Sequence, residues 1–95
     1  MINIKTSFFS LLEDIVGKKE ISLTFNNELT IRDILVRLNS LLGRNFEKNL
    51  FNAKGKLNKY IIIGINGKDI RKLDELDTMI KDGDEISFLP AIAGG

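Results

Sequence analysis

One amphipathic helix pattern, set among short strand patterns, is the feature that most limits how this 95-residue chain can fold. Its apolar side chains recur at spacings of three and four, which places them on one helix face: Ile31, Ile34, Leu35, Leu38, Leu41 and Leu42. Thr30 suits the N-cap, Asp33 favours the positive end of the helix dipole, and Gly43 stops the helix. A single apolar helix face needs a sheet to cover it, so the sequence predicts helix-on-sheet α+β packing.

Several strand patterns accompany this helix. Most of them alternate between apolar and polar side chains with a period of two, as a half-buried strand does. Residues 60–65 instead form a nearly continuous apolar run typical of an interior strand. Asn66-Gly67 is the preferred pair for a type I′ hairpin turn. The predicted strands are residues 2–9, 21–25, 60–65, 68–70 and 85–89.

Shorter segments connect these elements. Ser10 and Glu13 have the spacing of a capping box, and Gly17 suits the left-handed residue that ends a helix. Residues 73–80 indicate one or two helical turns. Residues 44–59 break the periodic pattern and carry five basic residues and one acid. We interpret this last segment as a surface loop or lobe with small apolar contacts of its own, from Phe46, Leu50 and Phe51.

The chain contains no cysteine and no histidine. This excludes disulfide scaffolds, thiolate nucleophiles, zinc fingers, Fe–S clusters and Ser-His-Asp triads. The net charge of +1 indicates no nucleic-acid or anionic-membrane partner for the chain as a whole. No apolar run reaches the roughly 18 residues of a membrane span, and the first residues do not resemble a signal peptide. We therefore expect a soluble cytoplasmic protein.

Three motifs with possible chemistry have simpler structural interpretations. Asp82, Asp84 and Glu85 offer carboxylates to a hard cation, but their spacing is not that of an EF-hand and a solvated turn explains them. Residues 64–68 superficially look like a phosphate loop and are better explained as a hairpin. The basic residues of segment 44–59 suit either nucleic acid or a solvated loop, and the loop is the simpler interpretation.

The end of the chain is its most unusual feature. Gly94-Gly95 follows a strand that Pro90 is expected to end, because proline cannot donate to the ladder. Glycine lacks a Cβ and can enter a channel too narrow for any side chain. We therefore expect a domain of residues 1–89 and a flexible tail of residues 90–95. The functional atom of this tail would be the backbone α-carboxylate of Gly95.

Both ends of the sequence resemble the ubiquitin-like β-grasp sulfur carriers. Residues 4–17 (IKTSFFSLLEDIVG) and residues 76–95 are similar to the small subunit of molybdopterin synthase, the latter through the KDGDE turn and the Pro-to-Gly-Gly close. The wider family includes the thiazole-synthesis carrier and the archaeal small modifier proteins. The resemblance implies a β-grasp roll, a mixed sheet of four to five strands packed on one main helix. Ala91 departs from the second proline that is frequent there, and segment 44–59 is longer and more basic than in compact members.

The resemblance also implies a chemistry for the tail. An E1-like adenylyltransferase would use Mg·ATP to convert the Gly95 carboxylate into an acyl-adenylate, and sulfur would replace AMP to leave a thiocarboxylate. The tail, led by Gly94 and Gly95, would then enter the large subunit of molybdopterin synthase. There it would give sulfur to a pterin precursor of the molybdenum or tungsten cofactor. ATP and its metal belong to the activating partner, so this chain would be a non-catalytic carrier that binds no cofactor.

Two alternatives to this pathway stay open. The same activated Gly95 suits a ubiquitin-like modifier, which would form isopeptide bonds with lysines of target proteins. The second alternative is a plain β-grasp interaction domain, in which the Gly-Gly end would have no chemical role. Within the carrier mechanism, sulfur transfer to thiazole or to tRNA also remains open.

Strand parity predicts a partner-binding surface beside the tail. Neighbouring residues of a strand face opposite sides of the sheet. If Phe88 faces the helix, Leu89 therefore faces away from it, and if Phe8 faces the helix, Phe9 likewise faces away from it. The resemblance makes the first and last strands neighbours, so Phe9 and Leu89 would form an exposed apolar patch unless loops cover them. The expected partner-binding residues are Phe9, Leu89, Pro90, Ala91, Ile92 and Ala93.

Overall fold

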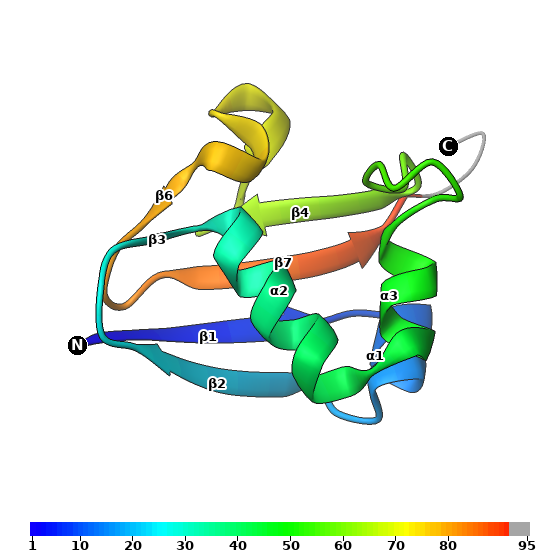
Figure 1. Ribbon diagram of the computed structural model, residues 1–95, viewed down its shortest axis with the longest axis horizontal. Coiled ribbons are helices and arrows are strands. Elements are labelled where there is room, and N and C mark those ends of the chain that lie inside the picture. Colours follow the sequence, from blue (N-terminus) through cyan, green and yellow to red (C-terminus); the bar gives the residue numbers. More distant parts are fainter. Residues whose placement is uncertain (92–95) are drawn as a thin grey trace.

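A five-stranded mixed sheet with one long helix across it forms the body of the protein (Figure 1). The computed structural model describes residues 1–91. The strands are β1 (Ile2–Phe8), β2 (Glu20–Phe25), β3 (Leu29–Thr30), β4 (Ile61–Ile65), β5 (Lys68–Asp69), β6 (Met79–Ile80) and β7 (Glu85–Pro90). The helices are α1 (Leu11–Val16), α2 (Ile31–Leu42) and α3 (Arg44–Leu50), with two short 3₁₀ helices, η1 (Ile70–Lys72) and η2 (Glu75–Asp77).

The first and last strands lie side by side at the centre of the sheet. The strand order is β2-β1-β7-β4-β5, and β1 and β7 run parallel with Phe8 opposite Phe88. The pairs β1–β2, β7–β4 and β4–β5 are antiparallel. The expected α+β roll with a mixed sheet and one main helix is confirmed. Asn66 and Gly67 both have positive φ, at 50° and 87°, as a type I′ turn requires.

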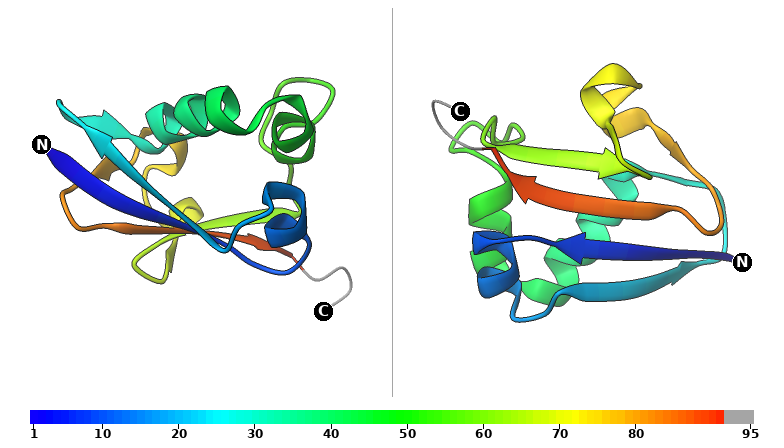
Figure 2. Two further views of the ribbon diagram at one scale, coloured as in Figure 1. Left: turned by 90° about the horizontal axis from the view of Figure 1, so that it is seen from below. Right: turned by 180° about the vertical axis from the view of Figure 1, so that it is seen from behind.

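The core lies between α2 and one face of the sheet (Figure 2). Ile31, Ile34, Leu35 and Leu38 of α2 are buried, whereas Leu41 at its last turn is exposed. The helix begins after Thr30, whose backbone N–H donates to the Asp33 carboxylate over 2.9 Å, in agreement with the sequence. None of the helices in residues 1–91 is long and apolar enough to cross a membrane.

Segment 44–59 differs from the expected loop. Its first half is α3, and Phe46 and Leu50 are buried in the main core rather than in a separate cluster. The Phe46 ring lies edge-on to Phe8 and Phe88, with ring centroids 6.0 and 6.2 Å away. The expectation failed because two apolar residues four apart are too few to show helical periodicity in a charged stretch.

One further local expectation was wrong, and another was met only in part. Ser10 makes no side-chain cap bond, because its backbone has φ 53° rather than the extended conformation that a capping box needs. Residues 73–80 contain one helical turn, the 3₁₀ helix η2, as expected, but they end in the short strand β6, which pairs with β3 in a separate two-stranded sheet. Strands of two residues are too short to show a period of two in the sequence.

Candidate functional site

The candidate site is the point at which the chain leaves the sheet after β7. The register pairs Pro90 with Ile61, so the strand continues one residue beyond the expected end at Leu89. The Ala91 backbone N–H then donates to the carbonyl oxygen of Tyr60 over 2.6 Å. Proline is tolerated at this position because the bond to Tyr60 comes from the N–H of Ala91, so the ladder does not need a donor at residue 90. The chain is therefore held by β4 up to Ala91.

The last four residues were part of the predicted site. Ile92, Ala93, Gly94 and Gly95 lie outside the described residues. Figure 2 places the exit point at the same end of the molecule as α1 and α3. The surroundings of this exit are therefore well defined.

Phe9 and Leu89 lie on neighbouring segments beside the exit. The Phe9 backbone N–H donates to the Phe88 carbonyl over 3.1 Å, which places Phe9 next to Leu89. The side chain of Leu89 is half-buried, and Phe9 is 45% exposed. The burial pattern of β7 alternates, with Ile86 and Phe88 buried, so Leu89 faces away from α2.

Two residues that the sequence analysis did not select extend this surface. Ile62 is paired with Leu89 and shares its face of the sheet, and it is half-buried. Tyr60, directly before β4, is 52% exposed. The parity of the run 60–65 would have identified both, once β4 was placed beside β7. We call Phe9, Tyr60, Ile62 and Leu89 the apolar patch.

The acidic turn proves to be structural. The Asp82 carboxylate accepts the Asn3 backbone N–H over 2.7 Å. Asp84 accepts the Lys81 backbone N–H over 2.7 Å and the Asn66 side-chain amide over 3.0 Å. Within residues 1–91, no group of three or more carboxylates is arranged to hold a metal ion. These bonds explain the KDGDE motif as the turn that starts β7.

Charged pairs with shifted pKa values lie away from the exit. The Lys5 ammonium lies 3.1 Å from Glu85 and 3.2 Å from Glu20, and these hydrogen bonds raise its pKa. The side-chain hydrogen bond from Arg71 holds the pKa of Asp69 below its usual range. The Lys5 pairs lie at the centre of the sheet and the Asp69–Arg71 pair lies at the far end of β4, so neither adjoins the exit.

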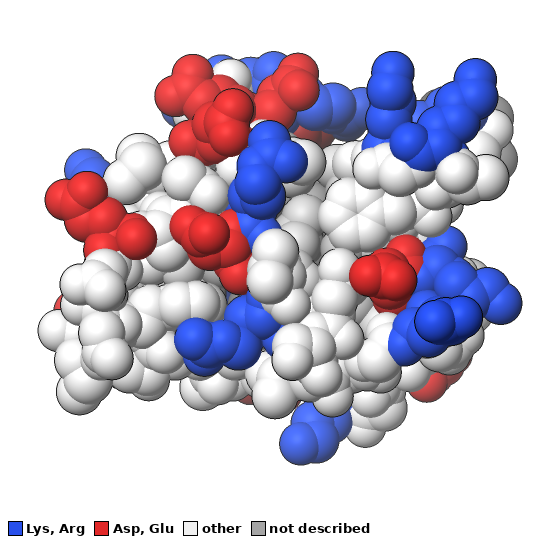
Figure 3. Space-filling view, in the orientation of Figure 1, with Lys and Arg blue, Asp and Glu red and all other residues white. Residues whose placement is uncertain are grey.

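The exit is bordered by positive charge. Figure 3 shows Lys and Arg side chains gathered at the α3 end of the molecule, whereas acidic and basic side chains are mixed over the rest of this face. The basic residues are Arg44, Lys48, Lys54, Lys56 and Lys59, and all are exposed. We call residues 44–59 the basic lobe.

Comparison with known proteins agrees with this geometry. A family model described as the ThiS family matches residues 7–95. A protein of Archaeoglobus fulgidus, provisionally named a sulfur carrier protein, is 34% identical over 68 residues, or 72% of this chain and 76% of the relative. Small archaeal modifier protein 3 of Haloferax volcanii is 29% identical over 98 residues, or 99% of this chain and 100% of the relative.

A solved structure extends the comparison to the fold. The solution structure of small archaeal modifier protein 1 from Methanosarcina acetivorans has a TM-score of 0.81 and 32% identity. The alignment covers 100% of this chain and 98% of that one. The expected β-grasp roll is thereby confirmed over the whole described chain.

Proposed function

This chain belongs to the ThiS family, and from that membership we propose that it carries sulfur as a C-terminal thiocarboxylate for molybdenum or tungsten cofactor synthesis. The relatives establish the general function as that of a sulfur carrier or a ubiquitin-like modifier. The cofactor pathway is the part that we add. The observation that supports the handling of the tail by partner proteins is that the chain, held at Ala91, leaves the sheet beside the apolar patch.

The proposed chemistry takes place at Gly95. A carboxylate resists nucleophiles because its negative charge is delocalised over two oxygens. An E1-like adenylyltransferase would join that carboxylate to the α-phosphorus of ATP, releasing pyrophosphate. Attack of sulfide on the acyl carbon would then expel AMP and leave the thiocarboxylate. The protein itself contributes the acyl group and the surfaces that its partners bind, while ATP and Mg²⁺ belong to the activating enzyme.

The composition of the chain suits this role. No cysteine is present, so no internal thiolate competes for the activated terminus. Gly94 and Gly95 would pass through a channel that excludes side chains. Pro90, Ala91, Ile92 and Ala93 would line the approach to that channel.

The apolar patch is the proposed docking surface for the proteins that handle the tail. Phe9 and Tyr60 are large apolar side chains that remain about half exposed, as partner-binding residues do. The carbonyl oxygen of Tyr60 accepts the Ala91 N–H, and the Phe9 N–H donates to Phe88 in the same strand that leads to Ala91. Both the adenylyltransferase and the large subunit of molybdopterin synthase must bind this end of the molecule to reach Gly95.

Transfer of sulfur to the pterin tests the proposed pathway. The thiocarboxylated chain would be mixed with the large subunit of molybdopterin synthase and the pterin precursor, and its intact mass followed. We expect a return from the thiocarboxylate to the carboxylate mass with formation of the dithiolene. Retention of sulfur in this mixture would contradict the molybdopterin route while leaving sulfur carriage intact.

The modifier function is a second candidate with its own support. The full-length relative of Haloferax volcanii is named a modifier, and it matches this chain over 99% of its length. The same acyl-adenylate would then react with the ε-amino group of a target lysine and release AMP. In a lysate supplied with ATP, tagged chain would appear in larger adducts whose tryptic peptides carry residues 82–95 on a target lysine, because Lys81 is the last site for trypsin.

A further inference from the structure

The positive charge of the molecule is concentrated in the basic lobe. The basic lobe contains five basic residues and one acid, a net charge of +4. Because the whole chain has a net charge of +1, all other residues together carry −3. Figure 3 shows the blue groups of the lobe at one end, with red and blue groups mixed over the rest of this face. The small total charge of the chain therefore conceals a local excess of positive charge in the lobe.

The basic lobe is an ordered structure anchored in the core. Phe46 and Leu50 are each 1% exposed. After α3 the chain forms a small hairpin in which Phe51 is bridged to Leu57. The Asn52 side chain accepts the backbone N–H groups of residues 54 and 56 over 2.9 and 3.1 Å. These bonds fix the hairpin that carries two of the lysines.

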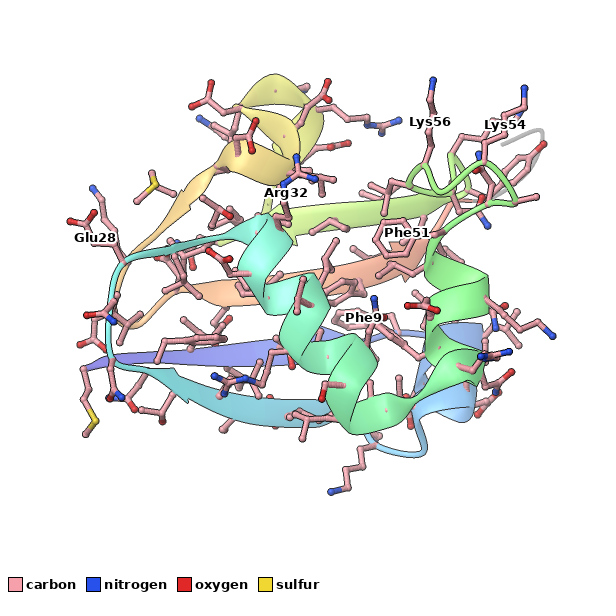
Figure 4. The ribbon with its side chains drawn as sticks, viewed as in Figure 1. Phe9, Glu28, Arg32, Phe51, Lys54 and Lys56 are labelled. Carbon is pink, nitrogen blue, oxygen red and sulfur yellow. The ribbon has the colours of Figure 1, made fainter. Side chains whose placement is uncertain are left out.

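The lysines point away from the body of the protein. Figure 4 shows Lys54 and Lys56 projecting outward on the same side of the hairpin, while Phe51 points inward. Among residues 1–91, no carboxylate forms an ion pair with any basic side chain of the lobe. A groove of about 610 Å³ lies between α3 and the hairpin, lined by Glu47, Lys48, Phe51, Asn52, Ala53 and Gly55.

Hydrogen bonds connect the basic lobe to the tail exit. The Asn58 side-chain oxygen accepts the Tyr60 backbone N–H over 2.9 Å, and the Tyr60 carbonyl accepts from Ala91 over 2.6 Å. The Lys59 ammonium lies 5.3 Å from the centre of the Tyr60 ring, close enough for a cation–π contact. The lobe therefore has a fixed position beside the point from which the tail leaves.

From this arrangement we propose that the basic lobe docks on an acidic surface of the adenylating enzyme, next to the channel that receives the tail. The proposal rests on the proposed function, and the adenylating enzyme is chosen because both the carrier and the modifier functions require it. Separated charge orients a molecule during its approach to a partner and raises the association rate. Here the positive lobe would turn the protein so that the side from which the tail leaves approaches the enzyme first.

The lobe suits a protein partner better than a nucleic acid. Proteins that bind single strands stack bases on exposed aromatic rings. In the lobe, Phe46 is buried and Phe51 is half-buried, and the neighbouring Tyr60 ring is engaged by Lys59. The net charge of −3 on the rest of the chain would also repel a phosphate backbone outside the lobe.

A pair of matched double variants tests the proposal. Lys54→Glu/Lys56→Glu reverses charge in the lobe, and Lys68→Glu/Lys72→Glu makes the same change at the other end of β4. All four lysines are exposed. The measurement is the association rate with the E1-like adenylyltransferase that activates the wild-type chain, by stopped flow at several salt concentrations. Equal melting temperatures would verify that both variants are folded.

We expect the lobe variant to associate roughly tenfold more slowly at low salt, with no comparable loss in the control variant. The difference should vanish near 1 M salt, where the Debye length is about 3 Å. Equal rates for all three proteins, or equal losses in both variants, would overturn the proposal. Loss of binding to a fluorescent single-stranded oligonucleotide, with unchanged enzyme association, would assign the lobe to nucleic acid instead. If the enzyme fails to adenylate the wild-type chain, the proposed function fails, and this inference with it.

Discussion

Ala91 donates its backbone N–H to the carbonyl oxygen of Tyr60 over 2.6 Å, at the end of the part of the chain that the structure describes. This bond connects the end of β7 to the segment between the basic lobe and β4. The tail therefore starts from a point with the apolar patch on the outer face of the sheet and positive charge on the lobe beside it. Both surfaces can guide the same short segment into a partner.

The length of the tail should be critical. Deleting Gly95, or adding one residue after it, would misplace the carboxylate in the adenylating site. We expect either change to abolish ATP–pyrophosphate exchange. The unfolding midpoint should stay the same, because the last residue of the described core is Phe88. A variant that lacks Gly95 and is still adenylated would contradict the assignment of the reacting group.

The apolar patch should bind the adenylating enzyme. Leu89→Asp places a charge at the centre of the patch. The dissociation constant of this variant for the adenylating enzyme should rise about tenfold or more. Ser22→Asp is the matched control, because Ser22 is exposed on β2. Calorimetry would measure both. Equal affinity of Leu89→Asp and wild type would show that the patch is not the docking surface.

The basic lobe should be part of the folding core. Phe46→Ala removes a ring that contacts Phe8 and Phe88, so the free energy of unfolding should fall by about 3–5 kcal/mol. Lys48→Ala, on the exposed side of the same helix, should change it by less than about 0.5 kcal/mol. Urea unfolding measures both values. A small loss for Phe46→Ala would mean that the lobe folds apart from the sheet.

Stability should depend on the pair formed by Asp69 and Arg71. The Asp69 carboxylate accepts from the Arg71 side chain and from its backbone N–H over 2.9 Å, which lowers the pKa of Asp69 from 3.8. Because the folded-state pKa lies below the unfolded one, the pair stabilises the protein above about pH 4. That contribution is lost as pH falls through the folded-state pKa.

The variant Asp69→Asn tests this dependence. The urea midpoint of the wild type should fall between about pH 5 and about pH 3. This fall should be smaller in Asp69→Asn, because the asparagine side chain does not titrate. An identical pH dependence in the variant and wild type would show that the pair contributes nothing to stability.

Much of the fold could be predicted because its patterns are long. The spacing in α2 and the alternation in β1 and β7 follow from residues close in sequence. Strand parity correctly placed Leu89 on the face of the sheet that points away from α2. The position of Ile62 beside Leu89 depends on strand pairing across more than twenty residues, which no local pattern contains. The spacing from Ser10 to Glu13 did not reveal that Ser10 adopts a φ of 53°.

The chemistry at Gly95 stays a prediction, and the surroundings of the tail exit were predicted incompletely. The Gly-Gly end and the residues Phe9 and Leu89 could be identified from composition, parity and resemblance. Segment 44–59 was recognised as basic, but its helix was missed because burial of Phe46 against Phe8 and Phe88 is a long-range effect. Charge alone therefore indicated a loop, and tertiary packing determined the ordered lobe.

The central claim is that Gly95 becomes a thiocarboxylate, and intact mass spectrometry tests it most directly. The chain would be incubated with an E1-like adenylyltransferase from the same genome, Mg·ATP and sulfide, and then treated with iodoacetamide. Because the chain has no cysteine, one alkyl adduct on a product with oxygen replaced by sulfur is the predicted result. An unchanged mass with every adenylating enzyme of that genome would contradict the account.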